Sequence, residues 1–108
     1  MEPIKATSAD VHVPAVNTAA VLTYAADVNQ RHVIGQVTVS YDAAPTAGLL
    51  TITNGGTTVF SVAVTAAGPA PLVFEPPLMG SYDSALVITL AAAGAAVTGR
   101  LNARHWEE

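Results

Sequence analysis

The chain has 108 residues, of which 51% are hydrophobic and only 11% are charged, and its formal net charge is −4. This length and apolar content indicate one domain with a packed core. They exclude the intrinsic disorder that results from high net charge and low hydrophobicity. The acidic balance argues against nucleic-acid binding, and the absence of cysteine excludes disulfides, thiolate metal sites and cysteine nucleophiles.

Neither export nor membrane insertion is expected. The first nine residues, MEPIKATSA, contain two charged residues and no apolar run of signal-peptide length. The longest apolar stretch, residues 85–97, is shorter than the roughly 20 residues of a membrane-spanning helix.

Short runs with the alternation of a β-strand follow one another along the chain and are separated by turn residues. In chain order the predicted strands are residues 10–16, 20–26, 31–41, 49–53, 57–65, 72–74, 84–90 and 97–104. In the clearest run, residues 31–41, we expect Val33, Gly35 and Val37 on the buried face and His32 and Ile34 on the other.

Turn residues support this division of the chain. Asn54, Gly55 and Gly56 predict a tight hairpin between the fourth and fifth strands, because these residues accept left-handed backbone angles. Prolines on both sides of residues 72–74 predict a brief edge strand between two loops. Residues 91–96 are predicted to form a loose turn, since this alanine-rich run is too short for a stable helix.

About eight short strands without a long helix indicate an all-β fold, an antiparallel β-sandwich with jelly-roll connectivity as one option. We expect residues 10–104 to form the sandwich, residues 1–9 an N-terminal arm and residues 105–108 a C-terminal tail. The predicted core consists of Val33, Val37, Val39, Leu50, Ile52, Phe60, Val62, Leu86, Ile88 and Leu101.

No residue pattern typical of catalysis or cofactor binding is found. No serine lies in a G-x-S-x-G turn, and no phosphate-binding helix is expected after the paired glycines. The histidines His12, His32 and His105 lack the spacing of a metal site, although they can still converge in space. We therefore predict a protein that is not an enzyme and that binds no metal or organic cofactor.

Two exposed segments are candidates for recognition. Trp106 either covers the open end of the sandwich or contacts another subunit. The proline-flanked loop 75–84 either packs over the sandwich or presents its large side chains to a partner. The candidate interface residues are Ile4, Leu78, Met79, Tyr82 and Trp106.

A resemblance to a known family is carried by four segments, AVLTYAA, RHVIGQVTVSYDAAPTAGLLTI, TTVFSVAVTAAGPAPLVFEPPL and SALVITLAAAGAAVTGRLNA. Over residues 19–103 their rhythm of strands and Ala/Gly/Thr-rich turns, with a proline-rich loop, resembles the small β-sandwich head decoration (cement) proteins of tailed bacteriophages. The resemblance implies a noncatalytic virion protein on the outer surface of the capsid, assembled in the host cytoplasm. Its implied partners are the major capsid protein and neighbouring copies of itself, in a dimer or trimer.

The alternative is a carbohydrate-binding or receptor-binding β-sandwich module of a phage tail or fibre. A sugar site needs an exposed aromatic side chain with hydrogen-bonding groups beside it. The candidate places are Tyr82 with Asp83 and Trp106 with Arg104. A small enzyme on a β scaffold is the least supported reading, because no nucleophile, base and orienting group are recognisable together.

Overall fold

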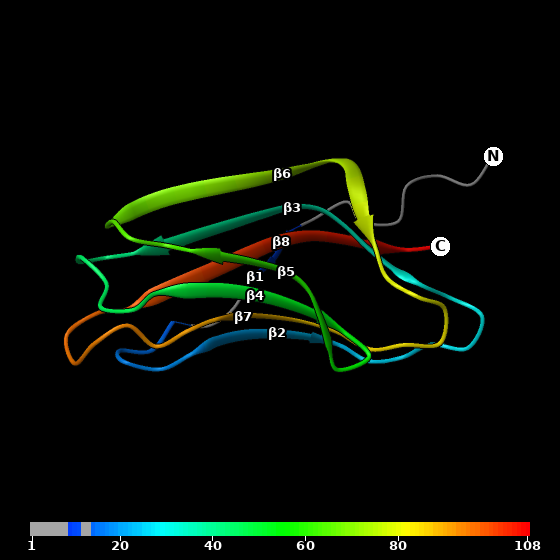
Figure 1. The fold of residues 1–108 in the computed structure, drawn as a ribbon, viewed down its shortest axis with the longest axis horizontal. Coiled ribbons are helices and arrows are strands. Elements are labelled where there is room, and N and C mark those ends of the chain that lie inside the picture. Colours follow the sequence, from blue (N-terminus) through cyan, green and yellow to red (C-terminus); the bar gives the residue numbers. More distant parts are fainter. Residues whose placement is uncertain (1–8, 12–13) are drawn as a thin grey trace.

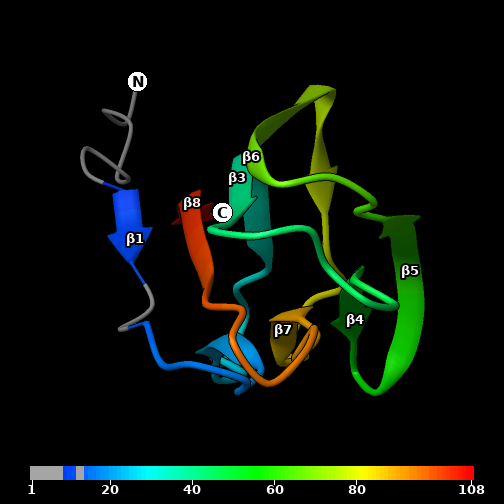
Figure 2. The same cartoon turned by 90° about the vertical axis from the view of Figure 1, so that its left-hand side faces the viewer.

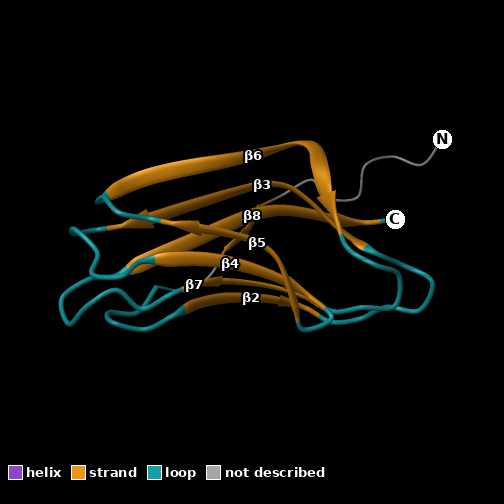
Figure 3. Ribbon diagram, viewed as in Figure 1, coloured by secondary structure: helices purple, strands orange, loops and turns teal. Residues whose placement is uncertain are grey.

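The computed structural model describes residues 9–11 and 14–108, with side chains described from residue 14 onward. Within this part of the chain every regular element is a β-strand, and no helix is long and apolar enough to cross a membrane (Figure 3). The strands are β1 (Ala9–Val11), β2 (Ala20–Tyr24), β3 (His32–Tyr41), β4 (Leu49–Asn54), β5 (Thr57–Ala63), β6 (Gly68–Met79), β7 (Leu86–Leu90) and β8 (Gly99–Glu107).

The strands form two four-stranded antiparallel sheets, which stack as two layers (Figure 1). The first sheet has the order β1-β8-β3-β6, with β1 at its edge beside β8 (Figure 2), and the second has the order β2-β7-β4-β5. Every connection except the β4–β5 hairpin crosses from one sheet to the other, as in a jelly roll. The predicted antiparallel sandwich is confirmed, and its connectivity is the jelly-roll option.

Gly55 and Gly56 form the predicted tight hairpin between β4 and β5. The two glycines separate Asn54 from Thr57 and have φ angles of 60° and 86°. Positive φ at both central residues matches the right-handed twist of the flanking strands, and glycine adopts it without a Cβ clash.

The core lies between the sheets and is largely aliphatic. Seven of the ten predicted core residues are buried in it, namely Val37, Val39, Leu50, Ile52, Leu86, Ile88 and Leu101. Phe60 and Val62 on β5 are partly buried against it. The Phe60 ring meets Phe74 of β6 edge to face, with ring centroids 5.1 Å apart, so the two edge strands are in contact across the side of the sandwich.

The tenth predicted core residue, Val33, is buried outside the core on the outer face of the first sheet. A β-bulge follows Ile34, where Gly35 is the extra residue of β3. One extra residue reverses the alternation of faces, so Ile34 and Val37 both point into the core. The predicted facing of β3 is therefore correct from Val37 onward and wrong before the bulge.

The proline-rich segment is one long edge strand rather than a brief strand between two loops. β6 extends from Gly68 to Met79, and β3 is its only neighbour in the first sheet. An edge strand has one side without a ladder partner, so prolines can occupy positions whose N–H would face solvent. The predicted edge position is confirmed, whereas the predicted loop 75–84 begins only after Met79.

β8 includes most of the predicted C-terminal tail. Glu107 pairs with His32 of β3, and the backbone groups of Glu108 and Arg31 exchange two hydrogen bonds of 3.0 and 2.9 Å. The tail expectation is wrong for residues 105–107 because β3 offers them a pairing partner. Residues 1–8 of the expected arm, including the candidate interface residue Ile4, lie outside the described residues.

Candidate functional site

Hydrogen bonds join the loops at one end of the sandwich. The Asn29 amide donates to the Asp83 carboxylate over 2.7 Å, and the Asp83 amide donates to the Gln30 carbonyl over 3.0 Å. The Gly80 amide donates to the His32 carbonyl over 2.8 Å. The β2–β3 loop and the β6–β7 connection are thereby held beside the end of β8, at the right of Figure 1.

Two histidines are in contact at this end of the sandwich. His32 of β3 is 2% exposed, and its Nδ1 lies 2.8 Å from Nε2 of His105 on β8. His32 Nε2 lies 2.7 Å from the carbonyl oxygen of Ala25, which can only accept, so this contact assigns the hydrogen to Nε2. In neutral His32, Nδ1 is then an acceptor and His105 donates to it. Tyr24 of β2 stacks on the His105 ring with centroids 3.7 Å apart.

Two carboxyl groups lie beside the histidines. Glu107 Oε2 is 3.6 Å from His32 Nδ1, and one ligand atom from each of Asp27, His32 and Glu107 lies within 4.8 Å of the other two. A hydrogen bond to Asp27 raises the pKa of Glu107 above its ordinary value, burial and the charge of Asp27 act in the same direction, and His32 lowers it. We call Asp27, His32, His105 and Glu107 the end cluster.

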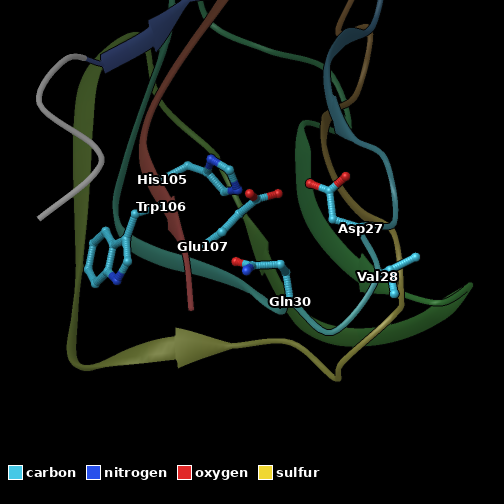
Figure 4. A pocket seen from close by; sticks show the side chains of 6 residues that line it. All are labelled: Asp27, Val28, Gln30, His105, Trp106 and Glu107. Atoms are coloured by element: carbon cyan, nitrogen blue, oxygen red, sulfur yellow. The ribbon is translucent and has the colours of Figure 1, made fainter. Parts of the chain in front are cut away.

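The end cluster borders an open cleft of about 620 Å³ (Figure 4). Asp27 and Gln30 of the β2–β3 loop lie across the cleft from Glu107. The Trp106 side chain points away from His105 and Glu107 in Figure 4, as expected for successive residues of a strand. His105 and Glu107 make the β8 side of the cleft polar, and Trp106, which also lines the cleft, directs its ring away from them.

On the outer face of the first sheet, the Trp106 ring lies against the β-bulge. A Cβ atom at Gly35 would lie 3.0 Å from Cζ3 and 3.2 Å from Cη2 of the ring, so glycine provides the space for it. The indole Nε1 donates to Glu108 Oε2 over 3.1 Å, which orients the half-buried ring. The ring packs on the bulge of β3, and the two predicted roles of Trp106, a lid over the sandwich end or a contact with another subunit, stay predictions.

A row of polar side chains continues this face beside Trp106. Gln36 pairs with Arg104, and Thr38 pairs with Asn102, across β3 and β8. The four residues line a shallow groove, in which the Gln36 amide donates to the Thr38 hydroxyl over 3.4 Å. We call this groove together with Trp106 the outer groove.

The predicted interface residues are in different environments. Leu78 is partly buried against the core, whereas Met79 is 46% and Tyr82 53% exposed. The Tyr82 ring centroid lies 5.1 Å from the Arg31 guanidinium, a cation–π contact. Met79 and Trp106 pair with Val33 from its two sides and therefore share the outer face of the first sheet, whereas Tyr82 lies on the β6–β7 connection.

Of the two candidate sugar sites, the structure favours Trp106 with Arg104 over Tyr82 with Asp83. Trp106 and Arg104 share the outer face of β8, two residues apart. The Asp83 carboxylate beside Tyr82 already accepts a hydrogen bond from the loop backbone. The sequence analysis missed the polar partners Gln36 and Asn102, although their alternation with core residues along β3 and β8 is a signal that could have found them.

No protein-family model and no curated protein matches the chain. Its fold is similar to that of the CBM36-1 domain of a multidomain xylanase from the hindgut metagenome of Trinervitermes trinervoides, with a TM-score of 0.49 and 10% identity over 84% of this chain and 71% of that one. A second similar structure is the carbohydrate-binding module CBM36 in complex with calcium and xylotriose, with a TM-score of 0.46 and 15% identity. The match covers 98% of this chain and 92% of that one. An insecticidal delta-endotoxin from Bacillus thuringiensis has a TM-score of 0.47 and 15% identity over 88% of this chain, which spans only 19% of the toxin. At such low identities, function has to be inferred from the chain's own residues.

Proposed function

We propose that the protein is a noncatalytic carbohydrate-binding module whose binding site is the outer groove. The observation that carries the proposal is an aromatic ring next to a row of amide, hydroxyl and guanidinium groups on one rigid sheet face. An aromatic face can pack on the apolar face of a sugar ring, and a few placed polar groups then fix its orientation.

The hydrogen-bonding capacity of the outer groove suits a ligand rich in hydroxyl groups. Gln36 and Asn102 each carry a carbonyl acceptor and an NH₂ donor, Thr38 can do both, and Arg104 adds donors. Among the described residues that line the groove, Arg104 alone is charged, which argues for a neutral ligand over one carrying several phosphates.

The size of the outer groove fits a short oligosaccharide. Asn102, Arg104 and Trp106 follow one another at every second position along β8, so they span about 13 Å at the usual rise of a strand. Both β3 and β8 have a strand on each side in the first sheet, which keeps the binding face rigid. A rigid site loses little conformational entropy when the ligand binds.

The function is tested by retention of the protein on immobilised polysaccharides, for example cellulose, xylan, chitin and a bacterial lipopolysaccharide, with a chelator present. We expect retention on at least one of them. The substitutions Trp106→Ala and Gln36→Ala should each weaken binding about tenfold or more, which corresponds to roughly 1.4 kcal/mol. Tyr82→Ala, which removes an exposed aromatic ring elsewhere, should leave binding unchanged. Retention on none of the polysaccharides, or equal retention of Trp106→Ala and wild type, would contradict the proposal.

Capsid decoration stays a prediction from the resemblance. Among the described candidate interface residues, Met79 and Tyr82 have exposed side chains that are accessible to a protein partner. Sedimentation of the protein with phage heads that lack a decoration protein distinguishes the two functions, because a glycan-binding module should remain unbound while a decoration protein should co-sediment.

A further inference from the structure

The end cluster has the chemistry of a metal site and lies on the opposite side of β8 from the outer groove. It combines two imidazoles with two carboxyl groups, donors that suit first-row transition metals such as Zn²⁺ better than calcium. The residues come from three separate places in the fold: Asp27 from the β2–β3 loop, His32 from β3, and His105 and Glu107 from β8.

The orientation of His32 is that of a metal-binding histidine. Its Nε2–H donates to the Ala25 carbonyl over 2.7 Å, and this leaves the lone pair of Nδ1 directed at the other members of the end cluster. Histidine ligands in proteins usually donate their second ring nitrogen to a carbonyl or carboxylate, which fixes the tautomer and the ring. Burial of His32 holds this arrangement in place.

Two distances from His32 are close to those of a metal site. When a metal binds, the hydrogen of His105 Nε2, which His32 accepts in the metal-free protein, moves to Nδ1 of the same ring, so that both imidazoles offer a lone pair. Ligands of a tetrahedral zinc ion with bonds of roughly 2.0 to 2.1 Å lie about 3.3 Å from one another. His32 Nδ1 is 2.8 Å from His105 Nε2 and 3.6 Å from Glu107 Oε2, on either side of that separation. Asp27 lies in the exposed β2–β3 loop, and its carboxyl group, hydrogen-bonded to Glu107, is already placed to contact the ion from the cleft.

The charges of the end cluster also favour a cation. Asp27 and Glu107 place two carboxyl groups next to each other at the cleft, and the positive charge of Arg31 is paired instead with Glu108 at 3.4 Å. A divalent cation between the carboxylates would replace their repulsion with attraction.

From this geometry we infer that the end cluster binds one divalent transition-metal ion, with Asp27, His32 and Glu107 as ligands and His105, beside His32, as the fourth. The expected tetrahedral arrangement of nitrogen and oxygen donors is typical of Zn²⁺. The inference is independent of the proposed sugar site, because the two sites share no residue. It also replaces the sequence-based expectation of a protein without metal.

The test is calorimetric titration of the full-length, chelator-treated protein with zinc sulfate and, separately, with calcium chloride. We expect one Zn²⁺ per chain, no saturable binding of Ca²⁺, and a rise in Tm of several degrees at saturating zinc. His105→Gln and Glu107→Gln, at half-buried positions, should each weaken zinc binding about tenfold or more. Glu108→Gln removes a carboxylate outside the end cluster, and this variant should bind zinc as the wild type does.

His32→Gln should abolish zinc binding, and circular dichroism of this variant shows whether the sandwich is retained. Should it not fold, the variants of His105 and Glu107 decide the matter without it. The spectrum of the Co²⁺-substituted protein gives a second readout, since tetrahedral Co²⁺ absorbs far more strongly in the visible range than octahedral Co²⁺. The inference is overturned if zinc produces neither saturable heat nor a change in Tm, or if binding survives both His105→Gln and Glu107→Gln.

Discussion

Tyr41 introduces a hydroxyl group into an otherwise aliphatic core. The side chain is 2% exposed, and its hydroxyl donates to the carbonyl oxygen of Ala91 over 2.7 Å. Burial raises the pKa of Tyr41 above 10.0, against the smaller opposing effect of a hydrogen bond from the Leu49 backbone. The bond connects the end of β3 to the turn after β7, and therefore joins the two sheets.

Replacement of Tyr41 by phenylalanine should lower the free energy of unfolding by about 1 kcal/mol near neutral pH, because the Ala91 carbonyl loses its donor. Urea denaturation followed by circular dichroism measures the change. A variant as stable as the wild type would contradict the role assigned to this hydrogen bond.

The raised pKa of Tyr41 also predicts a loss of stability in alkali. The folded state keeps the phenolic proton at pH values where the unfolded state has lost it, so stability is complete below pH 10 and decreases as the pH rises above it. Tyr41→Phe should lack this part of the decrease, whereas Tyr82→Phe, at an exposed tyrosine, should retain it. If the free energies of unfolding of the wild type and of Tyr41→Phe depend equally on pH between about pH 9 and 11, the burial of Tyr41 does not cause the loss of stability.

Among the elements, β3 determines both candidate sites through its bulge. The extra residue at Gly35 turns His32 inward to the end cluster and leaves Gln36 on the outer face, where it joins the outer groove. The same glycine provides the space in which the Trp106 ring lies. The bulge therefore positions the residues of both candidate sites in addition to bending the strand.

The substitution Gly35→Ala tests this role of the bulge. Its Cβ would lie within 3.0 Å of the Trp106 ring, so the ring should move outward, with a red shift in tryptophan fluorescence and weaker glycan binding. The core should be little affected, with a change of about 1 kcal/mol or less in the free energy of unfolding. Ser40→Ala, farther along the same face of β3, serves as the control. An unchanged emission spectrum would mean that Gly35 does not hold the position of the ring.

Local patterns predict most elements but not the bulge. Turn residues locate the β4–β5 hairpin, and alternation locates the core positions of β3 after Val37, because both signals are contained within a few neighbouring residues. The bulge depends on which strands pair with β3 and on the packing of Trp106, 71 positions away along the chain. The same reason explains why β8 continues through the expected tail.

The jelly roll places β3 and β8 side by side, although β3 is an early strand and β8 is the last strand of the sequence. This pairing brings His32 to His105 and Gln36 to Arg104. Sequence spacing cannot reveal such contacts, since they depend on a crossover between sheets. Trp106 and Arg104 were recognisable as a pair only because they lie on one strand.

Two surfaces with different chemistry therefore lie on opposite sides of β8. The outer side presents Trp106 and Arg104 to a neutral, hydroxyl-rich ligand, and the inner side contributes His105 and Glu107 to the end cluster. The end cluster and the outer groove have no residue in common, although Trp106 of the outer groove also lines the cleft beside the end cluster.

Carbohydrate binding in the outer groove is tested directly by titration of the ¹⁵N-labelled protein with oligosaccharides, followed by two-dimensional NMR. The oligosaccharides are fragments of cellulose, xylan, chitin and the lipopolysaccharide core. We predict that at least one of them shifts the Trp106 indole signal and the side-chain amide signals of Gln36 and Asn102, in a saturable manner, while the Tyr82 and Asp83 amide signals stay in place. Saturable shifts confined to the β6–β7 loop, or no shift with any oligosaccharide, would contradict the assignment of the outer groove as a carbohydrate-binding site.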